Sequence, residues 1–111
     1  MRAAIAPEIF ETVLTNLLEN SRQNGANRAD VTLSRADGEI QLSIADNGSG
    51  VSPANAGHIF ESFFTTRRDE GGTGLGLAIV RSLLRAYNGK ISLEPSVTGA
   101  IFRVTVPEAR G

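Results

Sequence analysis

Hydrophobic positions along this chain recur with two different periods, which predict long helices and alternating strands. The helical period predicts a helix over about residues 7–24, because Pro7 suits a first helical turn and Gly25 suits a stop. The Asp37-Gly38 pair between two alternating stretches is typical of a tight hairpin turn. The other predicted elements are a short helix near 58–62, a second long helix over about 74–87, and strands near 31–33, 40–44, 91–93 and 100–106.

The predicted strands alternate apolar and polar residues, so each is expected to keep one face in water. Helices can then cover only one side of the sheet. The predicted fold class is an α/β (α+β) two-layer sandwich, with helices packed on one face of a mixed, mostly antiparallel sheet of about five strands.

Composition narrows the possible functions. The 111 residues fit a single domain, and their net charge of −1 gives no electrostatic reason to expect nucleic acid or an anionic membrane as partner. The absence of cysteine excludes disulfides and thiolate metal sites. No apolar run approaches the length of a membrane span, so direct membrane insertion is not expected.

The first helix carries a polar stripe beside its apolar arc. On a helical wheel, Asn16, Asn20 and Gln23 fall at the edge of the apolar positions. Asparagine is a poor helix former, so two of them on a half-buried stripe need a reason. One reason is local hydrogen bonding to neighbouring loops. The other is an amide oxygen bound to a magnesium ion that also holds phosphates, because magnesium prefers hard oxygen ligands.

A carboxylate and two glycines follow the second predicted strand. Asp46 ends that strand, and a carboxylate at a strand end can accept a hydrogen bond from the exocyclic amine of adenine. Gly48 and Gly50 allow the backbone to approach a base closely. The alternative is an Asx turn in an ordinary glycine-rich loop.

A second glycine cluster lies where a loop runs into the second long helix. Free backbone amides at a helix start attract phosphates, and the glycines of segment 71–77 remove side chains that would block them. No Gly-Lys-Ser/Thr follows, so this is not a Walker P-loop. Between the clusters lie Phe60, Phe63 and Phe64, which suit a local hydrophobic staple, and Arg67, which either reaches phosphates or is a surface charge.

In order, segments 16–20, 46–50, 60–64 and 71–77 resemble the N, G1, F and G2 boxes of the histidine-kinase ATP-binding domain. This is the Bergerat ATP-binding fold that gyrase B, Hsp90 and MutL share. The resemblance covers about residues 7–107. It implies a domain that binds ATP and Mg²⁺ and donates the γ-phosphate to a histidine on a separate dimerisation domain, as the catalytic part of a two-component sensor histidine kinase.

The resemblance also implies roles for single residues. Asn20 stands where the family has its metal ligand, and Asn16 stands where ATP hydrolases of the superfamily have a water-activating glutamate. An amide cannot take a proton, so Asn16 favours transfer over hydrolysis. Glu19 is expected to face solvent and pair with Arg22, with an assisting catalytic role as the alternative. The predicted catalytic residues are Asn16, Glu19 and Arg67. The predicted nucleotide-binding residues are Asn16, Asn20, Gln23, Asp46, Gly48, Gly50, Val51, Phe60, Thr66, Arg67, Gly72, Thr73, Gly74, Leu75, Gly76, Leu77 and Phe102.

Two expectations concern the rest of the protein. Residues 1–111 are predicted to be one catalytic domain that lacks the dimerisation and phosphoacceptor domain, and so to be unable to autophosphorylate alone. The partners implied are ATP or ADP, the dimerisation domain of the same kinase and, indirectly, a response regulator. The implied location is cytoplasmic, which includes the cytosolic part of a membrane-bound sensor kinase. One alternative function is an anti-sigma-type serine kinase. The other is a regulatory nucleotide-binding module without transfer activity. Gln23 leaves this second alternative open, because many family members have a phosphate-binding lysine near this position.

Overall fold

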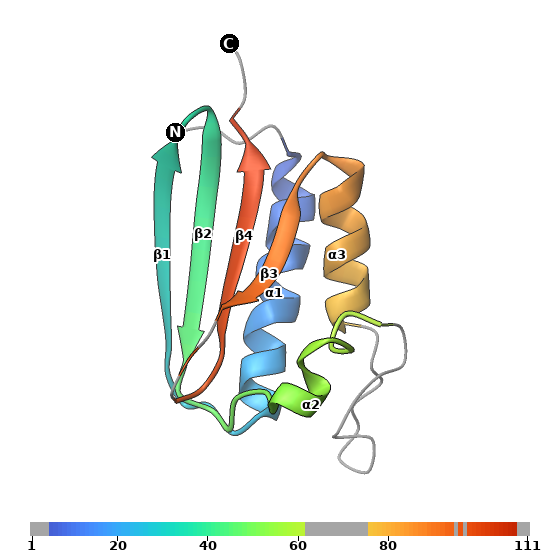
Figure 1. Ribbon diagram of the computed structural model, residues 1–111. Helices are drawn as coiled ribbons and strands as arrows, with labels where there is room; N and C mark the ends of the chain where they lie inside the picture. The colour runs from blue at the N-terminus through green and yellow to red at the C-terminus, as the bar shows by residue number, and fades with distance from the viewer. Residues whose placement is uncertain (1–4, 62–75, 95, 97, 109–111) are drawn as a thin grey trace.

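The computed structural model describes residues 5–61, 76–94, 96 and 98–108 (Figure 1). The elements in chain order are α1 (Pro7–Gln23), β1 (Ala29–Ala36), β2 (Glu39–Asp46), α2 (Pro53–Ala56), α3 (Gly76–Ala86), β3 (Lys90–Glu94) and β4 (Ile101–Pro107). The strands form one sheet in the order β1-β2-β4-β3, and all neighbouring strands are antiparallel.

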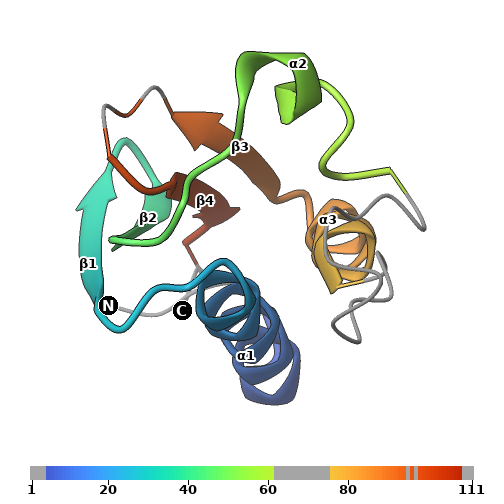
Figure 2. The same ribbon diagram turned by 90° about the horizontal axis from the view of Figure 1, so that it is seen from below.

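Helices α1 and α3 lie side by side on one face of this sheet, so the molecule has two layers (Figure 2). The core lies between the layers, and its buried residues are Val13, Leu17, Ile40, Leu42, Ile44, Ile59, Val80, Leu84, Ala100, Phe102, Val104 and Val106. The predicted two-layer α/β fold with helices on one face is therefore confirmed. Within the described part of the chain, no helix has both the length and the apolar composition that a membrane crossing requires.

Two details of the predicted fold are corrected. The described residues form four strands rather than about five, and the sheet is wholly antiparallel rather than mixed. The alternation of apolar and polar residues locates only these four strands. The short helix near 58–62 lies earlier, at 53–56, because Pro53 occupies its first turn and fixes the helical φ there. Residues 57–61 form hydrogen-bonded turns instead.

The predicted ends of the elements are confirmed at several turns. Gly25 follows the end of α1 with φ +83°, and Asn88 follows α3 with φ +62°, both in the left-handed region typical of helix stops. In the β1–β2 hairpin, Asp37 and Gly38 both have positive φ, at +53° and +78°. Two positive φ angles are the signature of a type I′ turn, which matches the twist of the flanking strands.

Candidate functional site

The carboxylate of Asp46 lies at the end of β2 and is only 7% exposed. Its Oδ1 accepts the backbone N–H of Gly48 at 3.0 Å and that of Ala100 at 3.1 Å. Its Oδ2 accepts the hydroxyl of Ser21 at 2.7 Å. A carboxylate offers about four acceptor directions, so these three donors leave one direction on Oδ2 open among the described residues. The group is therefore buried and fixed, yet still able to accept one more N–H.

Glycines allow the backbone to close around this carboxylate. A Cβ on Gly99 would lie 1.8 Å from the carbonyl oxygen of Asp46, and Gly99 has a φ of +66°. A Cβ on Gly50 would lie 2.7 Å from the carbonyl oxygen of Gly99, and one on Gly48 would lie 2.7 Å from that of Asn24. The predicted close approach of Gly48 and Gly50 is thus, in this structure, an approach to other backbone segments. Their contact with a base stays a prediction.

Hydrogen bonds join the loop after β2 to the end of α1. The N–H of Ser49 donates to the carbonyl of Asn24 at 2.9 Å. The side-chain oxygen of Asn47 accepts the N–H groups of Asn27 at 3.0 Å and Arg28 at 3.1 Å. Because these contacts bridge the two segments, Asp46 and the polar stripe of α1 are held in a fixed relation.

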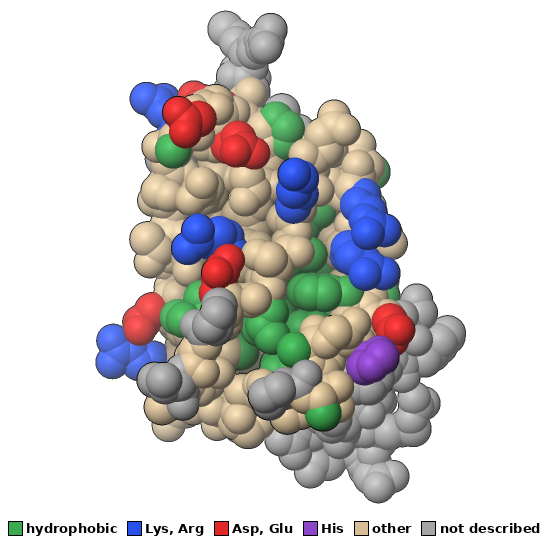
Figure 3. All heavy atoms as spheres, viewed as in Figure 1, with side chains coloured by type: hydrophobic (Ala, Val, Ile, Leu, Met, Phe, Trp, Pro, Cys, Tyr) green, Lys and Arg blue, Asp and Glu red, His purple; other side chains and the backbone are tan. Residues whose placement is uncertain are grey.

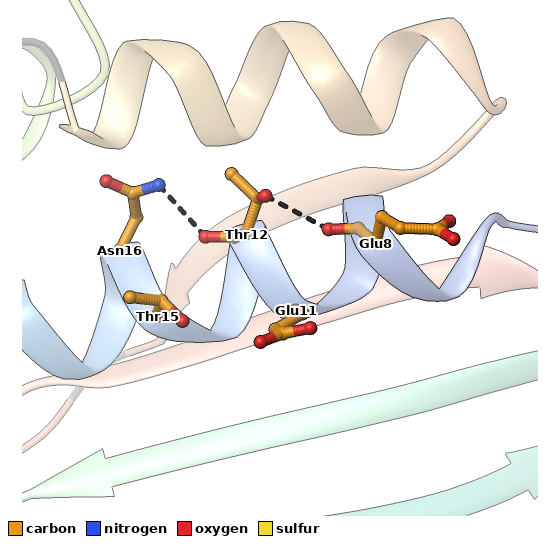
Figure 4. Close-up of a pocket in the computed structure, with 5 residues that line it drawn as sticks. All are labelled: Glu8, Glu11, Thr12, Thr15 and Asn16. Carbon is orange, nitrogen blue, oxygen red and sulfur yellow. Dashed lines mark hydrogen bonds between the residues drawn. The ribbon is translucent and has the colours of Figure 1, made fainter.

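The two asparagines of that stripe, Asn16 and Asn20, are half-buried on α1. Asn16 donates its amide N–H to the carbonyl of Thr12 at 2.9 Å, and its side chain extends toward α3 (Figure 4). Its Oδ1 lies 3.3 Å from where a Cβ on Gly76 would sit, so it borders the start of α3. The side chain of Asn20 makes no hydrogen bond to the described part of the chain, which leaves its amide oxygen available to a ligand.

Glu19 lies on the outer face of α1 and pairs with Arg22, as the sequence predicted. The hydrogen bond from Arg22 lowers the pKa of Glu19 and raises that of Arg22. A general base works best when its pKa is near the working pH, so this carboxylate is a weak base. Gln23 donates to Glu19 at 3.4 Å, a long contact that turns its amide toward the outer face. Any contact of Gln23 with a nucleotide stays a prediction.

An open hollow lies on the outer face of α1 and is lined by Glu8, Glu11, Thr12, Thr15 and Asn16 (Figure 4). The carboxylates of Glu8 and Glu11 repel phosphates, so this hollow is unsuited to a nucleotide. Its one connection to the predicted site is Asn16, at its edge.

Apolar side chains support the site from the sheet. Phe60 is half-buried and meets Phe102 edge-on, with ring centroids 6.3 Å apart. The predicted staple also includes Phe63 and Phe64, which lie outside the described residues, so it stays a prediction. Phe102 is fully buried, so in this structure it lies in the core behind the site. Val51 and Leu77 are half-buried against the same core. Figure 3 shows apolar side chains gathered between β3 and α3 on this side of the molecule. Nucleotide contacts of these four described residues stay predictions.

The remaining predicted residues are Thr66, Arg67, Gly72, Thr73, Gly74 and Leu75, and they lie outside the described residues. The structure adds three residues that the motifs did not indicate: Ser21, Gly99 and Ala100, all of which contact Asp46. For Ser21 a signal existed, because the helical wheel places this polar residue inside the apolar arc. Gly99 and Ala100 approach Asp46 only through the tertiary fold, so no local pattern marks them.

Comparison with known proteins gives a consistent result. The family model described as histidine kinase-, DNA gyrase B-, and HSP90-like ATPase matches residues 6–110. The adaptive-response sensory kinase SasA of Gloeothece citriformis is 35% identical over an alignment of 109 residues that covers 93% of this chain and 28% of that protein. The sensor-like histidine kinase SenX3 of Mycolicibacterium smegmatis is 37% identical over 108 residues, with 90% of this chain and 28% of that protein covered. The chain thus spans little more than a quarter of these curated relatives.

Solved structures agree in fold. The mycobacterial sensor histidine kinase MprB superposes with a TM-score of 0.80 and 27% identity, covering 94% of this chain and 73% of that one. Full-length ShkA in complex with AMPPNP superposes with a TM-score of 0.79 and 32% identity, covering 93% of this chain and 22% of that one.

Proposed function

The chain belongs to the family of histidine kinase-, DNA gyrase B- and HSP90-like ATPases, as an ATP-binding catalytic domain of the histidine-kinase type, and we propose how its residues serve that chemistry. Residues 1–111 act as one domain that binds Mg–ATP and donates the γ-phosphate to a histidine on the dimerisation domain of the same kinase. In this transfer the bond from the γ-phosphorus to the bridging oxygen breaks, a bond to the imidazole nitrogen forms, and ADP leaves. A response regulator is the indirect partner.

The buried carboxylate of Asp46 carries this proposal. Its open acceptor direction on Oδ2 takes the 6-amine of adenine, whereas guanine presents a carbonyl oxygen at that position and is repelled. Leaving a buried acceptor unpaired costs roughly 1–3 kcal/mol, so the base that fills it is strongly favoured. AMPPNP, the ligand of the ShkA complex, carries the same adenine, which supports the assignment.

The residues present also fit a magnesium ion bound together with the phosphates. Among the described residues, no three His, Cys, Asp or Glu side chains gather as a metal cage. Magnesium does not need one, because it keeps several waters and accepts one protein oxygen plus phosphate oxygens. The amide oxygen of Asn20, unused by the described part of the chain, provides that protein ligand. The ion would neutralise charge between the β- and γ-phosphates.

Two features favour transfer over hydrolysis. Asn16 borders the start of α3 but cannot take a proton from water. Glu19 points to the outer face, where Arg22 holds its pKa low. With neither side chain able to activate water, bound ATP persists until an acceptor histidine arrives. Arg67 and the glycines of 72–74 complete the phosphate contacts in this proposal.

Mixing the chain with the dimerisation domain and γ-labelled ATP tests the function. We expect label on the dimerisation domain that acid removes, as phosphohistidine requires, and none when its acceptor histidine is replaced by glutamine. Acid-stable label would instead indicate a serine kinase, and binding without any label would indicate a regulatory module.

Calorimetry tests the magnesium ligand separately. Asn20→Ala should abolish the gain in ATP affinity that magnesium gives the unmodified chain. Gln41→Ala is the matched control, because it removes a side-chain amide from β2 on the face away from the helices. Equal ATP affinity with and without magnesium in the unmodified chain would refute the assignment of Asn20.

A further inference from the structure

Two polar side chains are buried within the described part of the chain, and they are bonded to each other. Ser21 is 2% exposed and Asp46 is 7% exposed, and the hydroxyl of Ser21 donates to Oδ2 of Asp46 at 2.7 Å. A serine inside a helix commonly turns its hydroxyl back to the carbonyl four residues earlier. Ser21 instead reaches from α1 to the end of β2, across 25 residues of sequence.

We propose that Ser21 is a positioning residue for base recognition, and that its hydroxyl aims the open acceptor direction of Asp46 at the 6-amine of a purine. This inference rests on the proposed function of the site. According to this inference, Ser21 helps the site to bind 6-amino purines more tightly than purines that lack this amine.

The donors around the carboxylate lead to this role. Gly48 and Ala100 fill both acceptor directions of Oδ1 with backbone N–H groups, which fixes that oxygen. Oδ2 has only the hydroxyl of Ser21, so this bond decides where its remaining direction points. The hydroxyl proton is also committed to Asp46. It is therefore not available to a 6-oxo group, and the pocket presents an acceptor without a matching donor at this point.

The backbone holds Ser21 in place. Its carbonyl oxygen accepts the N–H groups of both Asn24 and Ala26, each at 3.1 Å, at the end of α1. Ser21 thus cannot follow a carboxylate that rotates, and the geometry of Asp46 is set by a fixed donor. Replacing the hydroxyl by hydrogen frees Oδ2 and leaves one of its lone pairs without a partner once a base covers the site.

Calorimetry with two nucleotides separates positioning from general support of the fold. Mg–ATP is compared with the Mg complex of purine riboside triphosphate, which lacks the 6-amine. For Ser21→Ala we expect ATP affinity to fall roughly tenfold and affinity for the analogue to change less than about twofold, so the preference for ATP collapses. Ser21→Thr, which keeps a hydroxyl, should retain the preference. Ser43→Ala removes a hydroxyl from the opposite face of β2 and should change neither affinity.

The other possible results of this calorimetry also support or refute the proposed role of Ser21. Equal losses for both nucleotides in Ser21→Ala would show a merely structural role and overturn the proposal, as would an unchanged ATP affinity. If thermal unfolding shows that Ser21→Ala does not fold, Ser21→Cys, which keeps the volume with a much weaker donor, is judged by the same ratio. If the unmodified chain binds ATP and Ser21→Ala keeps the same ratio of ATP affinity to analogue affinity, only this inference is refuted. A chain that binds neither nucleotide refutes the proposed function as well.

Discussion

The inner and outer faces of α1 each carry a polar pair, and the two pairs lie in opposite environments. On the inner face, Ser21 meets Asp46 in the interior, and the other donors to the carboxylate are backbone N–H groups. On the outer face, Glu19 meets Arg22 in water, with side chains 46% and 70% exposed. Water competes for the contacts of the inner pair far less than for those of the outer pair, because Ser21 and Asp46 are 2% and 7% exposed. Loss of an inner hydrogen bond is therefore expected to have the larger effect.

This difference is why we propose Asp46, and not Glu19, as the group that recognises the base. Asp46 is surrounded by neutral donors and keeps an acceptor direction open, so it can bind a ligand without first losing a partner. Glu19 already has an arginine, and any ligand must compete with that arginine and with water. Both residues are acidic, and both lie within the predicted boxes at 16–20 and 46–50. Only their surroundings distinguish them.

The largest effect should come from crowding the inner region at Gly99. Gly99→Ala places a Cβ against the carbonyl oxygen of Asp46 in a left-handed backbone conformation. Strain and overlap together should lower the free energy of unfolding by about 2–5 kcal/mol. Urea unfolding measures this, and ATP affinity should fall with it because Asp46 is displaced.

Gly25→Ala is the matched control for that variant. Gly25 also has a positive φ, +83°, but a Cβ there meets nothing within 4 Å. Only the backbone strain remains, roughly 1–2 kcal/mol. If the two variants lose the same free energy of unfolding, the close contact between Gly99 and Asp46 is not what constrains this region.

Exchanging each carboxylate for its amide compares the two faces directly. Asp46→Asn should weaken ATP binding by about 100-fold, because an amide that turns its N–H₂ toward the base repels the adenine amine. The preference for ATP over GTP should disappear in the same variant. Glu19→Gln should leave both affinities unchanged. Calorimetry with the two nucleotides measures this, and comparable ATP and GTP binding by the unmodified chain would refute the assignment of Asp46.

The sequence predicted the elements and the layers better than the contacts between them. Local chemistry is sufficient for the hairpin at Asp37-Gly38 and for the helix stop at Gly25, because positive φ there depends on the residue itself. The predicted position of Asp46 at a strand end is confirmed too, since it is the last residue of β2. Its donors Ser21 and Ala100 were missed, since they come from segments 25 and 54 residues away.

The edge strand β1 shows a second limit. Its alternation predicted a buried face, and the register does place Val31 opposite Ile44 and Leu33 opposite Leu42. Yet Val31 is 48% exposed and Leu33 is 50% exposed. The alternation predicts which side chains lie on the same face of the sheet. Whether the helices cover that face at the β1 edge depends on how the helices pack on the sheet. In β4, which lies between β2 and β3 in the sheet, the alternation does coincide with burial, and Phe102 is fully buried.

A kinetic prediction tests whether Asn16, in the polar stripe of α1, keeps the hydrolysis of ATP slow. The isolated chain should hydrolyse ATP very slowly, because Asn16 cannot act as a base. Asn16→Glu should raise the rate, and general-base help is typically worth about 10²–10⁴-fold when the carboxylate reaches the water. Phosphate release measures it, with Glu19→Gln as the control that hardly changes the residual rate. Brisk turnover by the unmodified chain that Glu19→Gln abolishes would make Glu19 the base and refute the role given to Asn16.

The smallest effect belongs to the pair on the outer face, and its sign follows from linkage. The hydrogen bond from Arg22 lowers the pKa of Glu19 below its ordinary value of 4.5 in the folded chain, so the folded state binds this proton less readily than the unfolded state. The pair therefore stabilises the fold above the ordinary pKa, and that contribution is lost as the pH falls through the lowered one. Urea unfolding of the unmodified chain and of Glu19→Gln should differ slightly at about pH 7. The difference should shrink as the pH falls below 4.5, and it should also shrink in high salt. A difference that does not shrink as the pH falls below 4.5 would mean that Glu19 stabilises α1 through packing rather than through its charge. The contrast between the two faces would then no longer rest on solvent exposure of the ion pair.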